Sequence, residues 1–416
     1  MDTVIAMILP VLTALITNNL VKMIYSIIPI GEKKIGISDY KPSPHRPDDA
    51  LYVQHGKLNT DMYKNLPRGL TVFEIDDNKY LLQGVRKFGY IDDPYKWNDD
   101  PIKTVYFLTK ENGEAFHVSA FSHEGELFVA VGSKNVHGVV RWNHFMEDLD
   151  NYKDTRYEFF KELATTLYGI LTSKHVNTFD FLNYLVENGC TAVAESCAIQ
   201  RQHLVKYKKD SLRFFALTSP YQTGLTYINP LESYKLFRSF GLDVVERIEV
   251  ADISDEVRLD ELNESFQTEE NSEGAVVYCA NENGDIVWMY KHKNNDYVFR
   301  RAIREKMRAK ATVSQIIERI NKLHFVHPKK DELLSYYLRF YAWVTMTDLG
   351  ISWDEVFSQW CSLEERFAQI SVEDKEKCFE EFMDKPIGKP TIMLMSPCPG
   401  IGKTSIGFIL AILLGY

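Results

Sequence analysis

The sequence lacks paired cysteines. Its six cysteines form no Cys-x-x-Cys pair and no zinc-ligand spacing, and they lie at Cys190, Cys197, Cys279, Cys361, Cys378 and Cys398. A zinc site is therefore not expected, and a reducing compartment is the default for such a chain. We expect a cytoplasmic or nuclear protein.

The sequence also lacks an excess of positive charge. It has 48 Lys and Arg against 58 Asp and Glu, a formal net charge of -10, which argues against a uniformly basic coat for nucleic acid. The charge is uneven, however: acids gather in 249–273, and basic residues gather in 291–310 and 201–213. Tyr290, Tyr297 and Phe299 interleave with the first basic stretch, which predicts a phosphate-binding and stacking surface; a charged helix face is the alternative.

No apolar run is long enough to cross a bilayer. Lys22 is the one charge between Val4 and Ile30, but the most apolar part, 4–16, contains Pro10 and is shorter than the roughly 20 residues required. Asp2 removes the positive start of a secretory signal. We expect residues 1–30 to form an apolar segment, with a helix packed on the body as the first interpretation and weak membrane association as the alternative.

Residues 31–304 have the pattern of an α+β domain with antiparallel sheets. Residues 72–84 predict two short strands around Asp76-Asp77-Asn78, and 105–131 predict an antiparallel meander in which Asn112-Gly113 is a hairpin turn. The remaining expected elements are helices at 155–170 and 178–188 and strands at 191–196, 203–207, 274–280 and 285–291.

The last part of the chain predicts two further units. Apolar residues at helical spacing indicate an all-helical module over 305–388. Residues 389–416 then read as a strand, a loop and a helix start, and the loop resembles a P-loop, whose amides cradle phosphates, although Pro397 stands where the first glycine is expected. Its candidate phosphate-binding residues are Gly400, Gly402, Lys403 and Thr404. Twelve residues follow Thr404, so we expect a truncated beginning of an α/β domain.

Five spaced signals predict the chemistry of the 31–304 region. They are Lys110-Glu111-Asn112-Gly113, Ser133-Lys134, Glu195, Glu273-Gly274-Ala275-Val276 and Lys291-His292-Lys293. A lysine nucleophile must lose its proton, and nearby cations favour its neutral form, so Lys291, Lys293 and a divalent metal would activate Lys110. Glu273 is the first candidate metal ligand. Glu195 is the second, for metal or ribose, and Lys134 is either a nucleotide contact or a solvated strand end.

Together these motifs resemble the ligase domain of fungal-type tRNA ligases, covalent nucleotidyltransferases related to the phage RNA ligases. The KxNG motif matches Lys110 to Gly113, the EGxV motif matches Glu273 to Val276, and the final KxK motif matches Lys291 and Lys293. Ser133-Lys134 is similar to the third motif, and Glu195-Ser196-Cys197 through His203 to the fungal-type block. Gln83 stands where the family's upstream block has arginine. The order of ligase domain, helical module and P-loop kinase domain also resembles this family.

The resemblance implies a nucleotidyltransferase fold with ATP-grasp-like antiparallel sheets and an ATP-dependent RNA ligase that uses Mg²⁺ or Mn²⁺. It implies Lys110, Lys291 and Lys293 as catalytic residues, and Asn112, Gly113, Lys134 and Glu195 as nucleotide contacts. The implied partner is RNA, such as cleaved tRNA halves whose 3′ end carries a 2′-phosphate, bound by a monomer. The alternatives are an mRNA-capping-type guanylyltransferase and a catalytically inactive, membrane-associated RNA-binding scaffold.

Overall fold

The computed structural model describes residues 21–42, 67–86, 88–91, 99–201, 203–221 and 224–384. The chain divides between Val298 and Phe299 into two compact units. The predicted P-loop segment and the first twenty residues lie outside the described residues. No described helix has the length and apolar character needed to cross a membrane.

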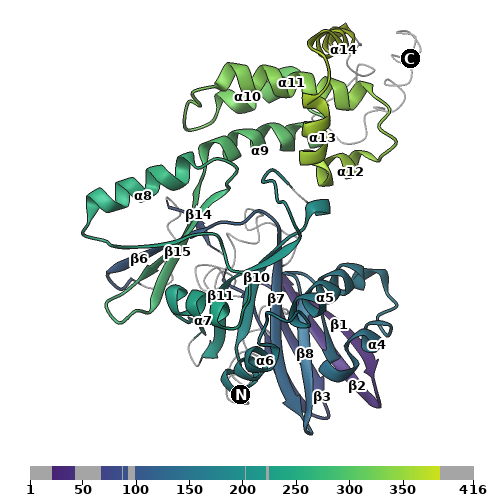
Figure 1. The fold of residues 1–416 in the computed structure, drawn as a ribbon, viewed down its shortest axis with the longest axis vertical. Coiled ribbons are helices and arrows are strands. Elements are labelled where there is room, and N and C mark those ends of the chain that lie inside the picture. The colour runs from purple at the N-terminus through teal and green to yellow at the C-terminus, as the bar shows by residue number, and fades with distance from the viewer. Residues whose placement is uncertain are drawn as a thin grey trace, which may run out of the picture. The chain divides into compact units, whose positions relative to one another are not determined.

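Among the described residues, the strands of the first unit form three sheets (Figure 1). The four-stranded sheet has the order β1 (Val21–Ile30), β2 (Lys33–Pro42), β3 (Leu70–Ile75) and β4 (Asn78–Leu82). The six-stranded sheet has the order β12 (Gly224–Tyr227), β11 (Ser211–Tyr221), β10 (Thr191–Cys197), β7 (Glu114–His123), β8 (Glu126–Gly132) and β9 (His137–Arg141). The five-stranded sheet has the order β13 (Ile248–Asp252), β6 (Thr104–Thr109), β14 (Gly274–Ala280), β15 (Ile286–Lys293) and β5 (Gly89–Tyr90). The β15–β5 pair is parallel and the other pairs are antiparallel, so the α+β prediction is confirmed.

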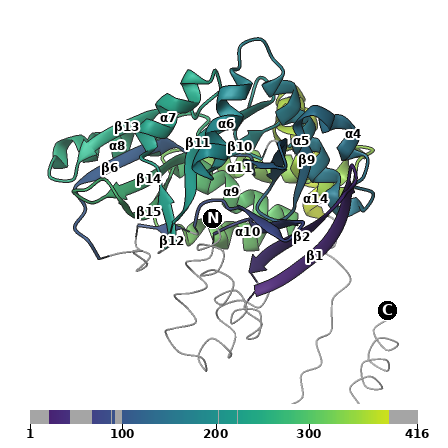
Figure 2. The same cartoon turned by 90° about the horizontal axis from the view of Figure 1, so that it is seen from below.

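The described part of the predicted apolar helix is a strand. β1 pairs with β2 (Figure 2), and burial alternates along it: Ile28 and Ile30 are buried, whereas Met23, Tyr25 and Ile27 are exposed. This two-residue period is that of a strand with one covered face. The helix prediction is therefore wrong over residues 21–30, because apolar content alone does not separate the two structures.

The hairpin predictions are confirmed in two places and wrong in a third. β3 and β4 pair around Asp76 and Asp77, which both have positive φ, and β7 pairs with β8. However, β6 and β7 belong to different sheets, so residues 110–113 cross between sheets and are not a hairpin turn. The strand predicted at 203–207 is also wrong, because these residues form bends and irregular structure.

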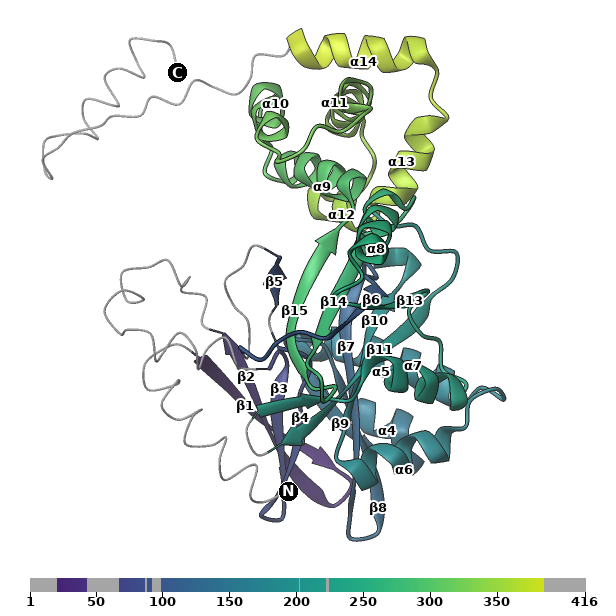
Figure 3. The same ribbon diagram turned by 90° about the vertical axis from the view of Figure 1, so that its left-hand side faces the viewer.

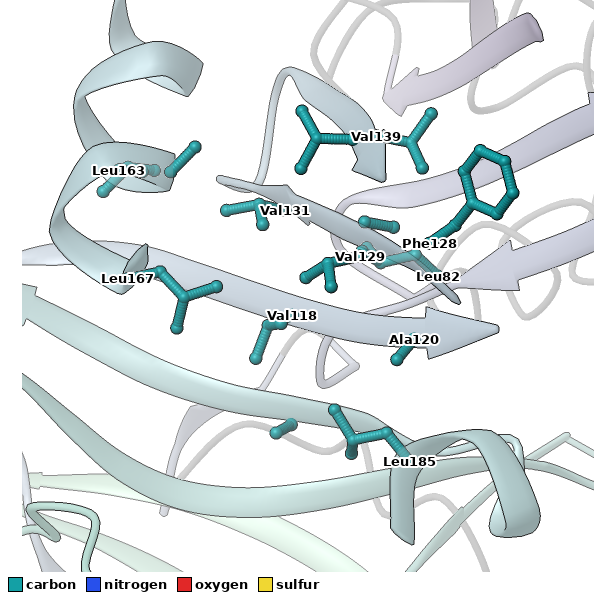
Figure 4. Packing of buried hydrophobic residues seen from close by; sticks show 14 of the residues in the cluster. Leu82, Val118, Ala120, Phe128, Val129, Val131, Val139, Leu163, Leu167 and Leu185 are labelled. Atoms are coloured by element: carbon teal, nitrogen blue, oxygen red, sulfur yellow. The ribbon is translucent and has the colours of Figure 1, made fainter. Parts of the chain in front are cut away.

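Helices cover one face of the six-stranded sheet. They are α4 (Phe145–Leu149), α5 (Glu158–Leu171), α6 (Thr178–Asn188) and α7 (Pro230–Ser239), of which α5 and α6 were predicted. Figure 4 shows Leu163 and Leu167 of α5 beside Val118 and Val131 of the sheet, within the large buried cluster of the unit. On β7, Phe121 instead stacks on Tyr80 of β4 at 3.9 Å between ring centroids. The six-stranded sheet is thus packed between helices and the four-stranded sheet.

The five-stranded sheet also has two covered faces. One face packs through Phe107 on Phe266 of α8 (Glu256–Thr268). The other shares a buried cluster with the six-stranded sheet, including Leu108 and Val276 from one sheet and Val193 from the other. Figure 3 shows β14 and β15 side by side next to α8. This second interface lies between the sheets that residues 110–113 connect.

A buried polar cluster joins the four-stranded and six-stranded sheets, and we call it the histidine cluster. Asp39 accepts hydrogen bonds from Arg156 at 2.7 Å and Thr71 at 2.9 Å, and His137 Nδ1 lies 2.8 Å from the Thr71 hydroxyl. His117 Nδ1 lies 3.1 Å from His137 Nε2. Burial, reinforced by His137, lowers the pKa of His117 well below its usual value.

The second unit is helical where the structure describes it. α9 (Asn295–Arg308) crosses the boundary between the units, and the later helices are α10 (Val313–Asn321), α11 (Lys330–Met346), α12 (Trp353–Ser358), α13 (Trp360–Ala368) and α14 (Val372–Asp384). Trp360 is fully buried and stacks on Phe357 and Tyr337. Aromatic packing of this kind supplies most of the core of a small helical unit.

Candidate active site

Residues Lys110 to Gly113 carry the chain from β6 to β7 and therefore from one sheet to the next. The Lys110 amide donates to the Gly274 carbonyl at 2.8 Å, and the Gly113 amide donates to the Glu195 carboxylate at 3.0 Å. A Cβ at Gly113 would lie 2.2 Å from the Ser196 carbonyl oxygen, closer than any side chain can approach. The crossing is thus anchored to both sheets, and its last position has room for glycine alone.

Glu273 is the centre of the site. Its Oε1 lies 2.9 Å from Lys110 Nζ and 2.7 Å from Lys293 Nζ, while its Oε2 accepts a hydrogen bond of 2.7 Å from the Asn112 amide group. The side chain is 4% exposed, so burial raises its pKa, but Lys110 and Lys293 outweigh burial and bring it to about 2. Glu273 is therefore ionised and pairs with both lysines.

The register of β14 and β15 explains why the two distant motifs meet. Gly274 pairs with Lys293 and Val276 with Lys291, so the carboxylate before β14 lies at the end of β15. Gly274 has a φ of +106°, and a Cβ there would lie 2.2 Å from the His292 carbonyl oxygen. Lys291 and Lys293 are two residues apart on one strand and point to the same face of the sheet.

Lys291 lies beside aromatic rings next to these groups. Its Nζ is 5.4 Å from the ring centroid of Phe88 and 5.7 Å from that of Tyr90, within the range of cation–π attraction. Burial and the charges of Arg68, Lys293 and Lys110 lower its pKa to about 8, although Glu273 opposes this. We call Lys110, Glu273, Lys291 and Lys293 the lysine cluster.

Two further groups complete the site. Burial raises the pKa of Glu195 to about 7 against the opposing charge of Lys110, so this carboxyl changes charge near neutral pH. The Asn112 amide group also donates to the Tyr297 hydroxyl at 3.0 Å, and its Oδ1 accepts from the amides of Leu204 and Val205. Asn112 therefore orients Glu273 rather than turning a hairpin.

The structure brings seven of the predicted residues together and leaves the others elsewhere. The seven are Lys110, Asn112, Gly113, Glu195, Glu273, Lys291 and Lys293. Lys134 is exposed in the turn after β8, where its charge acts on Glu114, and it makes no ion pair among the described residues. Gly400, Gly402, Lys403 and Thr404 lie outside the described residues.

The predicted stacking surface is wrong. Tyr290, Tyr297 and Phe299 are each less than 8% exposed, so they belong to cores and cannot stack on a nucleic acid. Arg300 pairs with Glu364, and Arg304 donates to the Phe357 carbonyl.

The second basic cluster is largely paired with acids. Three of its members form ion pairs, and these are Arg201 with Glu162, Lys209 with Asp243 and Arg213 with Glu111. Sequence reasoning missed the contacts of Glu111, within the nucleophile motif, with Tyr207 and Arg213, since no spacing links residue 111 to residues 207 and 213.

The site therefore combines a lysine at a sheet crossing with two more lysines and two carboxylates. The chain belongs to the family described as Domain of unknown function (DUF7920), whose model matches residues 46–304. A search of curated proteins gave no match.

Two solved structures show a distant overall likeness. An archaeal ATP-dependent RNA ligase is 12% identical with a TM-score of 0.42, covering 89% of this chain and 77% of its own. A mutant RNA ligase of Naegleria gruberi with ATP and Mn is 11% identical with a TM-score of 0.32, covering 68% of this chain and 97% of its own. At these identities and scores the likeness carries no information about activity.

Proposed function

We propose that this chain is an ATP-dependent RNA ligase of the tRNA-splicing type that works through a covalent lysyl-AMP. The observation that carries the proposal is the lysine cluster, in which Lys110 and Lys293 share one oxygen of the buried Glu273 carboxylate beside Lys291. Positive groups outnumber ionised carboxylates there, so the site favours an anion such as a polyphosphate. The sequence motifs that include Lys110, Glu273 and Lys293 also support the proposal, because they resemble those of covalent nucleotidyltransferases.

In the proposed first step, the neutral amine of Lys110 attacks the α-phosphorus of ATP. A bond forms between Nζ and phosphorus, and the bond to the bridging oxygen breaks, so that pyrophosphate leaves with the electron pair and Nζ releases a proton to water. Lys293 and Lys291 would balance charge on the phosphates during this step. AMP then passes to an RNA 5′-phosphate, and a 3′-terminal hydroxyl displaces AMP to join the ends.

Lys110 must leave the ion pair with Glu273 and lose a proton before it can attack. Glu273 and Glu195 offer the carboxylate oxygens that Mg²⁺ or Mn²⁺ prefers, and both carboxylates are within the site. A bound divalent cation would supply the positive charge that keeps Lys110 neutral.

Incubation with α-labelled ATP and Mg²⁺ or Mn²⁺ tests the proposal. We expect a covalent adduct in the wild type and none in Lys110→Ala. The matched control is Lys209→Ala, which removes an exposed lysine paired with Asp243 and should keep the adduct. Labelling by GTP in place of ATP would favour a capping-type guanylyltransferase, and an adduct that persists in Lys110→Ala would sink the assignment.

A ligation assay tests the finer part of the proposal. Cleaved tRNA halves whose 3′ end carries a 2′-phosphate should be joined faster than halves with a plain 3′ hydroxyl. Equal rates would leave a general RNA ligase and remove the tRNA-splicing assignment.

A further inference from the structure

Glu111 makes a second set of contacts within the nucleophile motif. Lys110 and Asn112 both contact Glu273, whereas Glu111 between them contacts Arg213 of β11 and Tyr207 of the segment before β11. Its carboxylate accepts from Arg213 Nη1 at 2.8 Å and from the Tyr207 hydroxyl at 3.1 Å. Its side chain is 3% exposed, and the ion pair is therefore largely shielded from water.

The Tyr207 hydroxyl connects this carboxylate to the backbone of the motif. It accepts a hydrogen bond of 2.8 Å from the Asn112 amide. A carboxylate can only accept and an amide N–H can only donate, so the hydroxyl must donate to Glu111 while it accepts from Asn112. The guanidinium of Arg213 lies 5.3 Å from the centroid of the Tyr207 ring, and this contact restricts the rotation of the ring.

These contacts fix the motif at its middle. Lys110 and Gly113 are held through their amides by Gly274 and Glu195, and the Tyr207 hydroxyl holds the Asn112 amide between them. Arg213 lies on β11, opposite Glu195 in the register of β10 and β11. The six-stranded sheet therefore holds the Gly113 amide directly through Glu195, and its Arg213 contacts the tyrosine that holds the Asn112 amide.

We propose that Glu111, Tyr207 and Arg213 form a positioning lock that sets the attack geometry of Lys110, a role that rests on the proposed function. Their contacts described above are with one another and with the Asn112 amide. They act through the backbone between Lys110 and Gly113, whose orientation decides where Nζ points once it leaves Glu273. Displacement of a reacting group by about 1 Å can lower a rate by about a hundredfold.

The lock predicts a defect in the chemical step and not in ATP binding. Tyr207→Phe removes the hydroxyl and keeps the ring beside Arg213. We expect its single-turnover rate of lysyl-AMP formation at saturating ATP to fall at least about tenfold. The ATP concentration that gives half the maximal rate should change by less than about threefold, because the lysine cluster is intact.

Tyr152→Phe is the matched control. Tyr152 is buried, and its hydroxyl, like that of the half-buried Tyr207, donates one hydrogen bond and accepts another, both of 2.7 Å with Val139. This variant loses the same kind of contacts away from the motif, so its labelling rate should stay within about twofold of wild type. Thermal unfolding of both variants shows whether each is folded.

Glu111→Gln and Glu111→Ala provide a second series if Tyr207→Phe does not fold. The glutamine keeps one oxygen acceptor for the side-chain donors Arg213 and Tyr207, so its rate should lie between those of wild type and alanine. Equal labelling rates in wild type and Tyr207→Phe, or an equal loss in Tyr152→Phe, would overturn the lock. Absence of labelling in the wild type would overturn the proposed function and the lock with it.

Discussion

The lysine cluster and the histidine cluster are both buried charged networks in the first unit, but their charges balance differently. In the histidine cluster one carboxylate, Asp39, meets one guanidinium, Arg156, and burial keeps His117 neutral. In the lysine cluster Glu273 meets two ammonium groups on one oxygen, with a third lysine nearby. A balanced network holds two sheets together, whereas a network with excess positive charge still has capacity for an anion.

The largest expected effect separates the two clusters through stability. Asp39→Asn leaves Arg156 without its carboxylate partner, and we expect the free energy of unfolding to fall by about 3 kcal/mol, as for other broken buried pairs. The rate of lysyl-AMP formation should be unchanged in the folded protein, since the partners of Asp39, Thr71 and Arg156, are not members of the lysine cluster. Urea unfolding and the labelling assay measure the two quantities, and a parallel loss of labelling would mean that the clusters are coupled.

Glu273→Gln should instead act mainly on the rate of lysyl-AMP formation. It removes the carboxylate that pairs with Lys110 and Lys293 and that would hold the divalent cation in the proposed reaction, and we expect the labelling rate to fall by about a hundredfold. The uncompensated lysines should also lower the melting temperature, and added pyrophosphate should restore part of that loss because it supplies negative charge. In Asp39→Asn the lysine cluster is intact, so pyrophosphate should raise the melting temperature only as much as it does in the wild type. An equal rise in the two variants, or no rise in Glu273→Gln, would remove the distinction drawn between the clusters.

A change in pH should have a smaller effect on the free energy of unfolding. The pKa of His117 is lowered from its ordinary value of 6.5 in the folded chain, so the unfolded chain binds a proton more readily as the pH falls below 6.5. The stability contributed by the neutral histidine is thus present above pH 6.5 and is lost below it, by up to about 1.4 kcal/mol per pH unit. His117→Gln should remove this slope in urea unfolding between pH 6.5 and 5.5. Identical slopes in the two proteins would assign the pH dependence to other groups.

The smallest effect is expected at an exposed ion pair. Arg201 and Glu162 pair on the surface with about half of each side chain exposed to water. Arg201→Gln should therefore change the free energy of unfolding by less than about 1 kcal/mol, and high salt should reduce the difference further. A loss as large as that of Asp39→Asn would show that exposure does not distinguish the two pairs.

The sequence predicts the site better than it predicts the path of the chain through it. Lys110, Glu273 and Lys293 are recognisable because each lies in a motif at a strand end, and the register of β14 and β15 then brings two of them together. The pair Asn112-Gly113 was misinterpreted because a local turn signal is indistinguishable from a sheet crossing when the partner strands are unknown. Pairing of β7 with β10 and of β6 with β14 depends on contacts far apart in sequence.

Other errors have equally physical causes. The strand at 21–30 has β-branched residues in a mostly apolar run interrupted by Lys22 and Ser26, and such a run fits a buried helix and a strand equally well until its partner is known. The basic residues in 201–213 were interpreted as a surface because a sequence does not show which acids they meet. Arg213 meets Glu111 across 102 positions, and no local pattern contains that information.

The crossing of Lys110 to Gly113 between two sheets has a mechanical consequence. The sheets that contain β6 and β7 share an apolar interface, and side chains at such an interface can slide by small amounts without breaking hydrogen bonds within either sheet. A slide of about 1 Å would change the reach of Lys110 by a similar distance, and so its rate of attack. A substrate that binds to both sheets would therefore change the rate of attack by Lys110 through the relative position in which it holds the two sheets.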